Sequence, residues 1–313
     1  MGAFLHAVGV FFHHLTEVQW TAFGIALACQ LVKLLFRARA WQNIVRASYP
    51  GGRLRYRHAF GAYVAGVGVN SIAPARGGDL VKLYLVKHRM EGATYPTLAS
   101  TLVVETMFDF FIAGGLMIWA LSIGVLPTHQ VYSRIPTVDW KFFLRHEEAT
   151  AIGLAVLALA GIVVFFWARR RVEDFWERVR LGFAILGDRR RFTLGVLVPQ
   201  AVSWIFRIAT LYFFLEAFGV HASVHNALLA QVVDSLATLF PATPGGAGTK
   251  QGLIVYLFRR SAVSTSLLLA FSVGMNIAIT VENLLLGLTA IGLMARTLSF
   301  KRLRLHARTE QAR

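Results

Sequence analysis

Apolar runs of bilayer length alternate with short basic segments along this chain. A helix needs about 20 apolar residues to cross a hydrocarbon core about 30 Å thick. Five runs are close to this length and contain few charged residues, and each is predicted to be a membrane-crossing helix. The predicted crossings are Trp20–Phe36, Leu98–Leu126, Thr150–Ala168, Phe192–Phe218 and Val263–Ala295.

Two further apolar stretches are broken in the middle by proline and glycine. His58–Arg89 is interrupted at Pro74–Gly78, and Asn226–Phe258 is interrupted at Pro241–Gly248. Proline removes a backbone donor and glycine costs backbone entropy, so both end helices and leave halves that are too short to span. Broken backbone is tolerated at membrane depth only where protein or a water-filled cavity surrounds it. Each stretch is therefore predicted to be a re-entrant helical hairpin.

The order of these elements repeats along the chain. A crossing, a hairpin and a crossing come first, a linking crossing follows, and the same three elements recur, with Pro74 in the first break and Pro244 in the second. The linking crossing makes the second unit enter from the opposite side, which is typical of transporters with paired broken helices. The predicted fold is an all-α, polytopic integral membrane bundle with two re-entrant hairpins in an inverted repeat. We predict a single membrane domain over 1–313, with half-repeats at about 20–126 and 192–295, a linking span at about 150–168 and a basic tail at 296–313.

Composition and charge favour a membrane protein over other classes. Hydrophobic residues make up 56% of the chain and charged residues 15%, whereas soluble domains average about 45–50% and about 25%. The net charge is +16, and arginines concentrate in the predicted loops Arg37–Arg57 and Arg169–Arg191. The positive-inside rule places these loops and the C-terminus in the cytoplasm. Apolar residues at helical spacing in Arg171–Arg191 predict an amphipathic helix on an anionic leaflet, and no nucleic-acid partner is expected.

The chemistry at the two breaks suits an anion. Each Gly-rich break opens a helix whose first N–H groups lack partners and attract phosphate or carboxylate. In the first break, the backbone of Gly77 and Gly78 allows close approach, while Arg76 and Lys82 add positive charge. The second break is predicted to bind the lipid phosphate in the same way, through Gly245, Gly246, Gly248 and Lys250. Ordinary interhelical loops, with glycine for turning and arginine for lipid headgroups, are the alternative.

Polar residues around the first break have structural roles as well. Asp79 is expected to cap the following helix and to pair with Arg76. Asn70 precedes the break and can satisfy freed backbone groups.

Carboxylates inside the apolar runs form the second set of candidates. Glu105 and Asp109 are four residues apart and share one face of a predicted helix. Because a carboxylate in hydrocarbon is costly, it normally faces the bundle interior. Two interpretations stay open: structural pairing with Arg76, Lys82 or Arg207, or titration and gating as a headgroup passes. The residues predicted to balance charge or gate the site are Asn70, Asp79, Glu105, Asp109, Arg207 and Glu282.

Together these motifs resemble the signature of one membrane family. The run from Asn70 to Leu85 resembles the N…P-x-R-x-G-[DE]…[RK] pattern of the lysylphosphatidylglycerol synthase membrane-domain family, also called the flippase-like or UPF0104 family. Glu105 and Asp109 match its E-x-x-x-D helix, and Pro241–Gly248 matches its P-G-G-x-G break. The similarity covers about residues 20–295.

The resemblance implies an integral membrane domain that moves or handles lipids. Family members are associated with aminoacylated phosphatidylglycerol, polyprenyl-linked sugars or hopanoids. Lys250 departs from the family, which often has an acid at this position, and the added cation favours a phosphate-bearing cargo. Only a short basic tail follows the last predicted span, so no soluble aminoacyl-transfer domain is expected.

We therefore predict a transporter or flippase for an anionic lipid or a lipid-linked precursor, not an enzyme. Its expected partners are an anionic membrane lipid or polyprenyl-phosphate-linked cargo, the membrane, and an envelope-synthesis enzyme. No cofactor or metal is predicted, and the single Cys29 cannot form an internal disulfide. One alternative is a membrane-embedded lipid-modifying or glycosyl transferase with Glu105 or Asp109 as base. The other is a non-transporting partner of an envelope-synthesis enzyme that docks through Arg169–Arg191.

Overall fold

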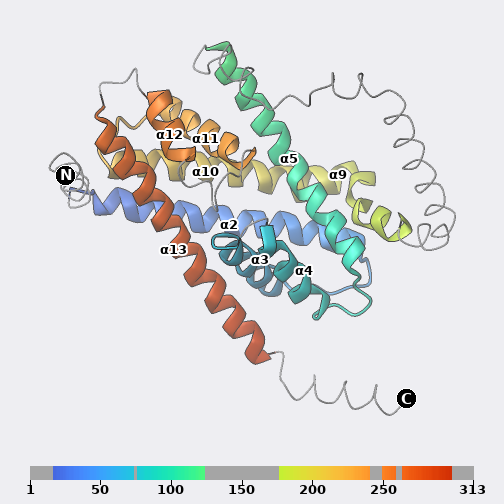
Figure 1. Cartoon of the computed structure of the whole chain (residues 1–313). Coiled ribbons are helices and arrows are strands. Elements are labelled where there is room, and N and C mark those ends of the chain that lie inside the picture. The colour runs from blue at the N-terminus through green and yellow to red at the C-terminus, as the bar shows by residue number, and fades with distance from the viewer. Residues whose placement is uncertain (1–16, 74–75, 124–175, 240–248, 259–262, 298–313) are drawn as a thin grey trace, which may run out of the picture.

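The regular structure of this protein is helical throughout the part that can be described. The computed structural model describes residues 17–73, 76–123, 176–239, 249–258 and 263–297, and no strand occurs among them (Figure 1). The first half contains α2 (Trp20–Ser48), α3 (Tyr56–Asn70), α4 (Gly77–Lys87) and α5 (Tyr95–Ser122). The second contains the 3-10 turn η2 (Ala184–Gly187), α9 (Arg189–Phe192), the π-helical turn η3 (Thr193–Leu197), α10 (Val198–Ala217), α11 (Val224–Leu239), α12 (Thr249–Leu257) and α13 (Thr265–Thr297).

Four of these helical segments are long and apolar enough to cross a membrane. They agree with four of the five predicted crossings, and the fifth, Thr150–Ala168, lies outside the described residues. The chain is therefore a multi-pass helical membrane protein. The four segments are Trp20–Ser48, Tyr95–Ser122, Arg189–Ala217 and Thr265–Met294.

The first crossing is longer than the sequence pattern indicates. Helix α2 continues past Phe36 to Ser48, so the prediction of a loop over Arg37–Arg57 is wrong for most of that segment. Arginine, alanine and glutamine, which fill this stretch, all favour helix formation, and the helix therefore continues where the apolar run ends. As a result, Arg37 lies inside a membrane span.

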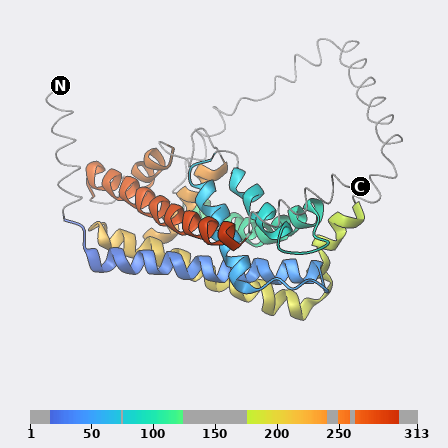
Figure 2. The same ribbon diagram turned by 90° about the horizontal axis from the view of Figure 1, so that it is seen from below.

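Helices α2 and α10 lie side by side and run in opposite directions (Figures 1 and 2). At one end, the Gln19 N–H, just before α2, donates to the carbonyl oxygen of Ala217 at 2.9 Å. At the other end, the Asn43 amide donates to the carbonyl oxygen of Gly195 at 2.8 Å. The end of α2 and the start of the α10 span therefore lie on the same side of the bundle.

The short helices α3 and α4 begin and end on one side of the bundle, whereas α11 begins on the opposite side. Leu54, just before α3, accepts a hydrogen bond from Gln42 near the end of α2 at 2.8 Å. Thr94, which follows α4, donates its N–H to the Tyr49 hydroxyl at 2.9 Å, again at the end of α2. The start of α11 instead lies beside the far end of α5, where the rings of Trp119 and His225 are 5.4 Å apart.

Two large apolar cores and a small third one, around Ile44 and Val104, hold the described helices together. One large core includes Ala22 and Ala26 of α2 and packs mainly against α10 to α13. The other large core includes Leu34 and Trp41 of α2 and packs mainly against α3, α4 and α5. Between them, α2 places Gln30 and Lys33, so a polar layer separates the two cores.

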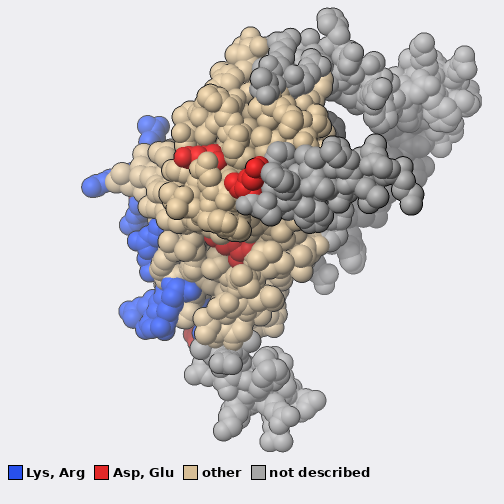
Figure 3. Space-filling view, turned by 90° about the vertical axis from the view of Figure 1, so that its left-hand side faces the viewer, with Lys and Arg blue, Asp and Glu red and all other residues tan. Residues whose placement is uncertain are grey.

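The outer surface of the spans is apolar. Phe110 and Ile118 on α5 are 75% and 71% exposed, as expected for side chains that face lipid. In Figure 3, the face seen from the left-hand side of Figure 1 carries few charged residues, and Lys and Arg gather along one of its edges. The described surface therefore has the charge distribution of a membrane-embedded bundle.

Helices α3 and α4 approach each other so closely that one contact position requires glycine. A Cβ added at Gly78 would lie 1.9 Å from the carbonyl oxygen of Gly66. We expect Gly78→Ala to lower the free energy of unfolding by about 1–3 kcal/mol, because the helices must move apart to accommodate it. Reversible unfolding in mixed micelles measures this change. Gly115→Ala is the control, since nothing lies within 4 Å of the added methyl group, and an equal loss in both variants would contradict the prediction.

Candidate functional site

An ion-paired cluster, here called the first cluster, joins helices α2, α3, α4 and α5. The Arg37 guanidinium donates to both carboxylate oxygens of Asp109, at 2.9 and 2.5 Å. Arg37 also donates through Nε to the Tyr63 hydroxyl at 2.8 Å, and this hydroxyl donates to Glu105 Oε1 at 2.8 Å. The other oxygen of Glu105 accepts from Lys82 Nζ at 2.6 Å. The cluster therefore contains two cations and two carboxylates and is neutral as a unit.

Burial makes this pairing obligatory. Lys82 and Glu105 are each only 4% exposed, and the Lys82 ammonium lies 4.1 Å from the ring centroid of Trp41 and 4.2 Å from that of Tyr63. An aromatic face attracts a cation and replaces part of its lost hydration. Because Glu105 and Asp109 share one face of α5, both carboxylates reach the same group of cations.

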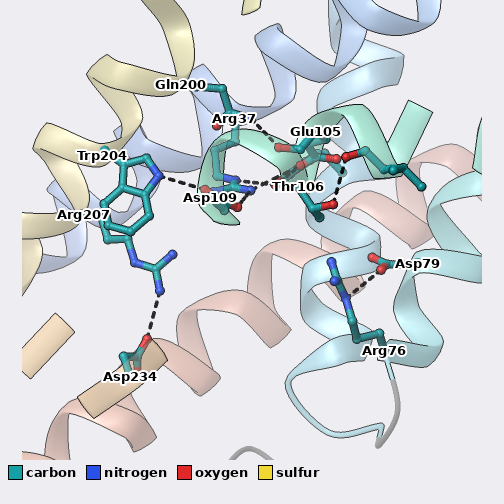
Figure 4. Close-up of polar contacts among 12 residues, drawn as sticks. Arg37, Arg76, Asp79, Glu105, Thr106, Asp109, Gln200, Trp204, Arg207 and Asp234 are labelled. Carbon is teal, nitrogen blue, oxygen red and sulfur yellow. Dashed lines mark hydrogen bonds and ion pairs between the residues drawn. The ribbon is translucent and has the colours of Figure 1, made fainter. Parts of the chain in front are cut away.

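Trp204 connects this cluster to a second one. Its indole Nε1 donates to Asp109 Oδ1 at 2.8 Å, so this oxygen accepts from both Arg37 and Trp204. The Arg207 guanidinium lies 4.9 Å from the Trp204 ring centroid, one turn further along α10. Figure 4 shows this connection running from Glu105 through Asp109 and Trp204 to Arg207 and Asp234.

The second cluster joins α10, α11, α12 and α13. Arg207 donates to Gln231 Oε1 at 2.6 Å and to Asp234 Oδ2 at 3.1 Å. The other oxygen of Asp234 pairs with Lys250 Nζ at 2.5 Å, and Lys250 also donates to Asn276 Oδ1 at 3.3 Å. We call the connected series the polar track; its members are Lys82, Glu105, Tyr63, Arg37, Asp109, Trp204, Arg207, Asp234 and Lys250.

Lys33 adds positive charge beside the second cluster. Its ammonium donates to the Gln30 side chain, and no salt bridge joins it to a carboxylate within the described ranges. Gln30 donates in turn to Asn283 at 3.2 Å, and Asn283 donates to Ser71 Oγ at 3.3 Å. Glu282 has one buried carboxylate oxygen that accepts no hydrogen bond from the described residues. Among its described residues, the second cluster thus contains two cations, Arg207 and Lys250, that share one carboxylate, Asp234.

The track lies near the middle of the membrane spans. At 1.5 Å per residue, Arg37 is about 17 Å from the nearer end of α2, while Glu105 and Arg207 are each about 15 Å from the nearer ends of their spans. Half of a hydrocarbon core is about 15 Å thick. The charged side chains are therefore at a depth where water does not solvate them unless a cavity forms.

The first break has its own polar contacts. Arg76 has a positive φ of 58°, and its guanidinium is 3.0 Å from Asp79. The Asn70 side chain accepts from the N–H of Gly78 at 2.7 Å and donates to Asp79 at 3.2 Å. The predicted pairing of Asp79 with Arg76 is confirmed. The predicted capping by Asp79 is wrong, because Asp79 lies inside the first turn of α4 and the Asn70 side chain accepts from the N–H at the helix start, as expected for Asn70.

The structure distributes the predicted site residues over three places. Asn70, Arg76, Gly77, Gly78 and Asp79 lie together at the break before α4. Lys82 belongs to the first cluster with Glu105 and Asp109, because its side chain points to α5. Arg207 and Lys250 meet in the second cluster. Glu282 is on α13, and the predicted glycines of the second break, Gly245, Gly246 and Gly248, lie outside the described residues.

Sequence reasoning misses several members of the track. The sequence pattern assigns Arg37 to a loop and does not distinguish Tyr63 and Trp204 from other aromatic residues. One signal in the sequence could have pointed to Arg37. The number of residues between Arg37 and Arg207 equals the number between Pro74 and Pro244, the prolines of the two breaks. Among the described residues, no group of three or more metal-ligating side chains gathers, so the site as described is one of ion pairs.

Comparison with known proteins identifies the family. The model of the family described as "Lysylphosphatidylglycerol synthase TM region" matches residues 3–287. A UPF0104 membrane protein of Methanothermobacter thermautotrophicus is 24% identical over 259 residues, which cover 76% of this chain and 73% of that protein. A second protein of the same name and organism is 22% identical over 270 residues, 80% of this chain and 78% of its own length.

A more distant similarity is partial. Glycosyltransferase AglD of Haloferax volcanii is 27% identical over 213 residues, which are 57% of this chain but only 34% of that protein. No solved structure matches the chain. The family match spans nearly the whole sequence, as the motifs at the first break and in α5 led us to expect. The chain is a member of the lysylphosphatidylglycerol synthase transmembrane-region family.

Proposed function

We propose that this protein moves an anionic, phosphate-bearing lipid or lipid-linked precursor across the membrane. The observation that carries the proposal is the polar track, a connected series of charged and hydrogen-bonding groups at mid-membrane depth. Ionisable residues are rare inside membrane spans, and they generally mark pathways for ions or polar substrates. A headgroup that must cross hydrocarbon needs such groups, whereas a purely structural bundle can be built from apolar side chains.

The charge of the track suits a phosphate. Each cation in the two clusters is held by a carboxylate or an amide. A phosphate has the charge and the acceptor oxygens to replace a carboxylate at Arg or Lys, and charge-assisted hydrogen bonds are the strongest available here. Arg207 and Lys250 both pair with Asp234, so two cations share one carboxylate, and this makes the second cluster the stronger place for an added anion. No cofactor is required in this mechanism, and we propose transport rather than catalysis.

The arrangement of the helices supports transport through an inverted repeat. The helices α2 to α5 are in turn long, short, short and long, and the same order of lengths recurs in α10 to α13. Phe36 and Phe206, which immediately precede Arg37 and Arg207, stack on each other with centroids 6.3 Å apart. Two antiparallel helices related by a twofold axis bring equivalent residues together at that axis. We place the axis at this stacked pair, which makes Arg37 and Arg207 equivalent, and we take the two short-helix pairs as re-entrant hairpins that open to opposite sides.

The side of the bundle that is rich in arginine indicates how the protein is oriented in the membrane. Arg53, Arg55 and Arg57 follow the end of α2, and Arg189 begins the α10 span on the same side. The end of α13 lies there too, because Arg89 donates to the carbonyl oxygen of Met294 at 3.1 Å. By the positive-inside rule we place this side, and with it the C-terminus, in the cytoplasm of the inner (plasma) membrane.

A transferase is the second candidate, and the partial similarity to a protein named glycosyltransferase favours it. In that case Glu105 or Asp109 would act as a base. Both carboxylates are already bound to cations, which disfavours their use in proton abstraction. Incubation of the purified protein with nucleotide-sugar donors and a polyprenyl phosphate would detect such an activity as product formation.

Translocation in reconstituted vesicles tests the proposal. We expect labelled phosphatidylglycerol to cross at least about tenfold faster than labelled phosphatidylcholine, because both carry a phosphate but the choline ammonium of phosphatidylcholine is repelled by the cations. We expect Arg76→Asn to slow phosphatidylglycerol by about tenfold or more, while Arg76→Lys keeps part of the rate. Asparagine tolerates the positive φ of Arg76, so the change removes charge without distorting the backbone. Arg76→Asn that matches the wild-type rate would contradict the role assigned to this residue.

A further inference from the structure

A separate pocket lies where α2 ends and the α10 span begins. It has a volume of about 650 Å³, and its lining includes Asn43, Arg46, Arg190, Arg191 and Gly195. Arg46 is nine residues beyond Arg37 on α2, which corresponds to about 13 Å along the helix axis. The pocket is therefore at the membrane surface, away from the track at mid-depth.

A π-helical turn shapes one wall of this pocket. Residues Thr193–Leu197 form the turn, and the Asn43 side chain donates to the carbonyl oxygen of Gly195 within it at 2.8 Å. Single π-helical turns inside α-helices occur frequently at functional sites.

The charge of the pocket is strongly positive. Its lining holds three arginines and one acid, Asp188, whose carboxylate is 3.2 Å from Arg191 Nε. Arg46 uses Nε for the carbonyl oxygen of Leu54, at 3.2 Å, and neither of its Nη groups donates to another described residue. Arg46 and Arg190 therefore have guanidinium groups available for an added anion. Planar guanidinium groups suit the oxygens of a phosphate.

One side of the pocket is apolar. Leu194, which lines it together with Ala47 and Ile185, is 59% exposed. An exposed leucine beside arginine is typical of side chains at the boundary between headgroups and acyl chains. A ligand that matches both features combines a phosphate with an apolar tail, which a membrane lipid does and a free phosphate does not.

We infer that this pocket binds the phosphate headgroup of an anionic lipid in the adjacent leaflet, as a site distinct from the polar track. The lipid phosphate lies between Arg46 and Arg190, and its acyl chains pack beside Leu194. The inference does not depend on transport, because a resident lipid can occupy the pocket whether or not the track moves a second one.

Lipid binding to the intact protein in detergent tests this inference. Native mass spectrometry measures the retention of phosphatidylglycerol and phosphatidylcholine by wild type, by Arg46→Gln/Arg190→Gln and by Arg189→Gln. Arg189 is the matched control, because it is an exposed arginine adjacent to Arg190 that does not line the pocket. We expect phosphatidylglycerol to bind the double variant at least about tenfold more weakly and the control variant within about twofold of wild type.

Three results would overturn the inference. If wild type retained the two lipids equally, the pocket would not select an anionic headgroup. Equal loss in the double variant and in Arg189→Gln would show diffuse attraction to a basic surface. Displacement of the lipid by an equimolar concentration of inorganic phosphate would identify a site for free phosphate instead. Circular dichroism of each variant verifies that the helices are intact.

Discussion

Glu105→Ala is expected to lower the free energy of unfolding by about 3–5 kcal/mol. The substitution leaves the Lys82 ammonium buried without a carboxylate and removes the acceptor of the Tyr63 hydroxyl. Removal of one partner of a buried ion pair has this cost because the remaining charge cannot recover its hydration. Reversible unfolding in mixed micelles measures the loss.

Met107→Ala is the control for this experiment. Met107 is on the same helix as Glu105, but it is exposed on the lipid-facing surface, so its truncation is expected to change the free energy of unfolding by about 0.5 kcal/mol or less. If Glu105→Ala were as stable as Met107→Ala, the first cluster would not hold its charges in the way described.

Arg207→Met is expected to reduce the translocation of an anionic lipid by about 10–100-fold. Arg207 links Trp204 to Asp234, so its loss divides the polar track between the two clusters. A hydrogen bond to a charged group contributes about 1.5–3 kcal/mol, and each 1.36 kcal/mol in a barrier is tenfold in rate. The assay is translocation of labelled phosphatidylglycerol in reconstituted vesicles.

Stability should change less in this variant than in Glu105→Ala, because Asp234 keeps its pairing with Lys250. Arg39→Met is the matched control, since Arg39 is an arginine within a membrane span that contacts Gln42 and Tyr56 and not the track. A translocation rate for Arg207→Met equal to that of Arg39→Met would show that the connection between the clusters is not used.

Much of the architecture could be predicted from the sequence because lipid imposes simple rules. Length and hydropathy identify the four described spans, and proline and glycine mark the interruption between α3 and α4. The predicted end of α2 is wrong because the apolar run ends at Phe36, whereas residues that favour a helix continue to Ser48. Because of that error, Arg37 is not predicted as a site residue, since its role depends on its depth in the membrane.

The partners within the site could not be predicted from the sequence. Glu105 has Arg76, Lys82 and Arg207 as candidates, and only the packing of α4 against α5 selects Lys82, 23 residues away in the chain. Trp204 gives no signal, because tryptophan is common in membrane helices for reasons unrelated to hydrogen bonding. Its role arises because α5 and α10 both pack against α2, which brings Asp109 of α5 within reach of Trp204.

The most direct test of the central claim is translocation by Lys82→Met/Glu105→Gln. This double variant removes one cation and one carboxylate together, and the glutamine oxygen can still accept from Tyr63. Replacement of both members of a buried ion pair by neutral groups is often neutral or stabilising, so the helices should remain folded. If the polar track carries the phosphate, the variant is as stable as wild type but moves phosphatidylglycerol about tenfold more slowly or worse. A stable double variant with the wild-type rate would contradict the account and leave the first cluster a purely structural feature.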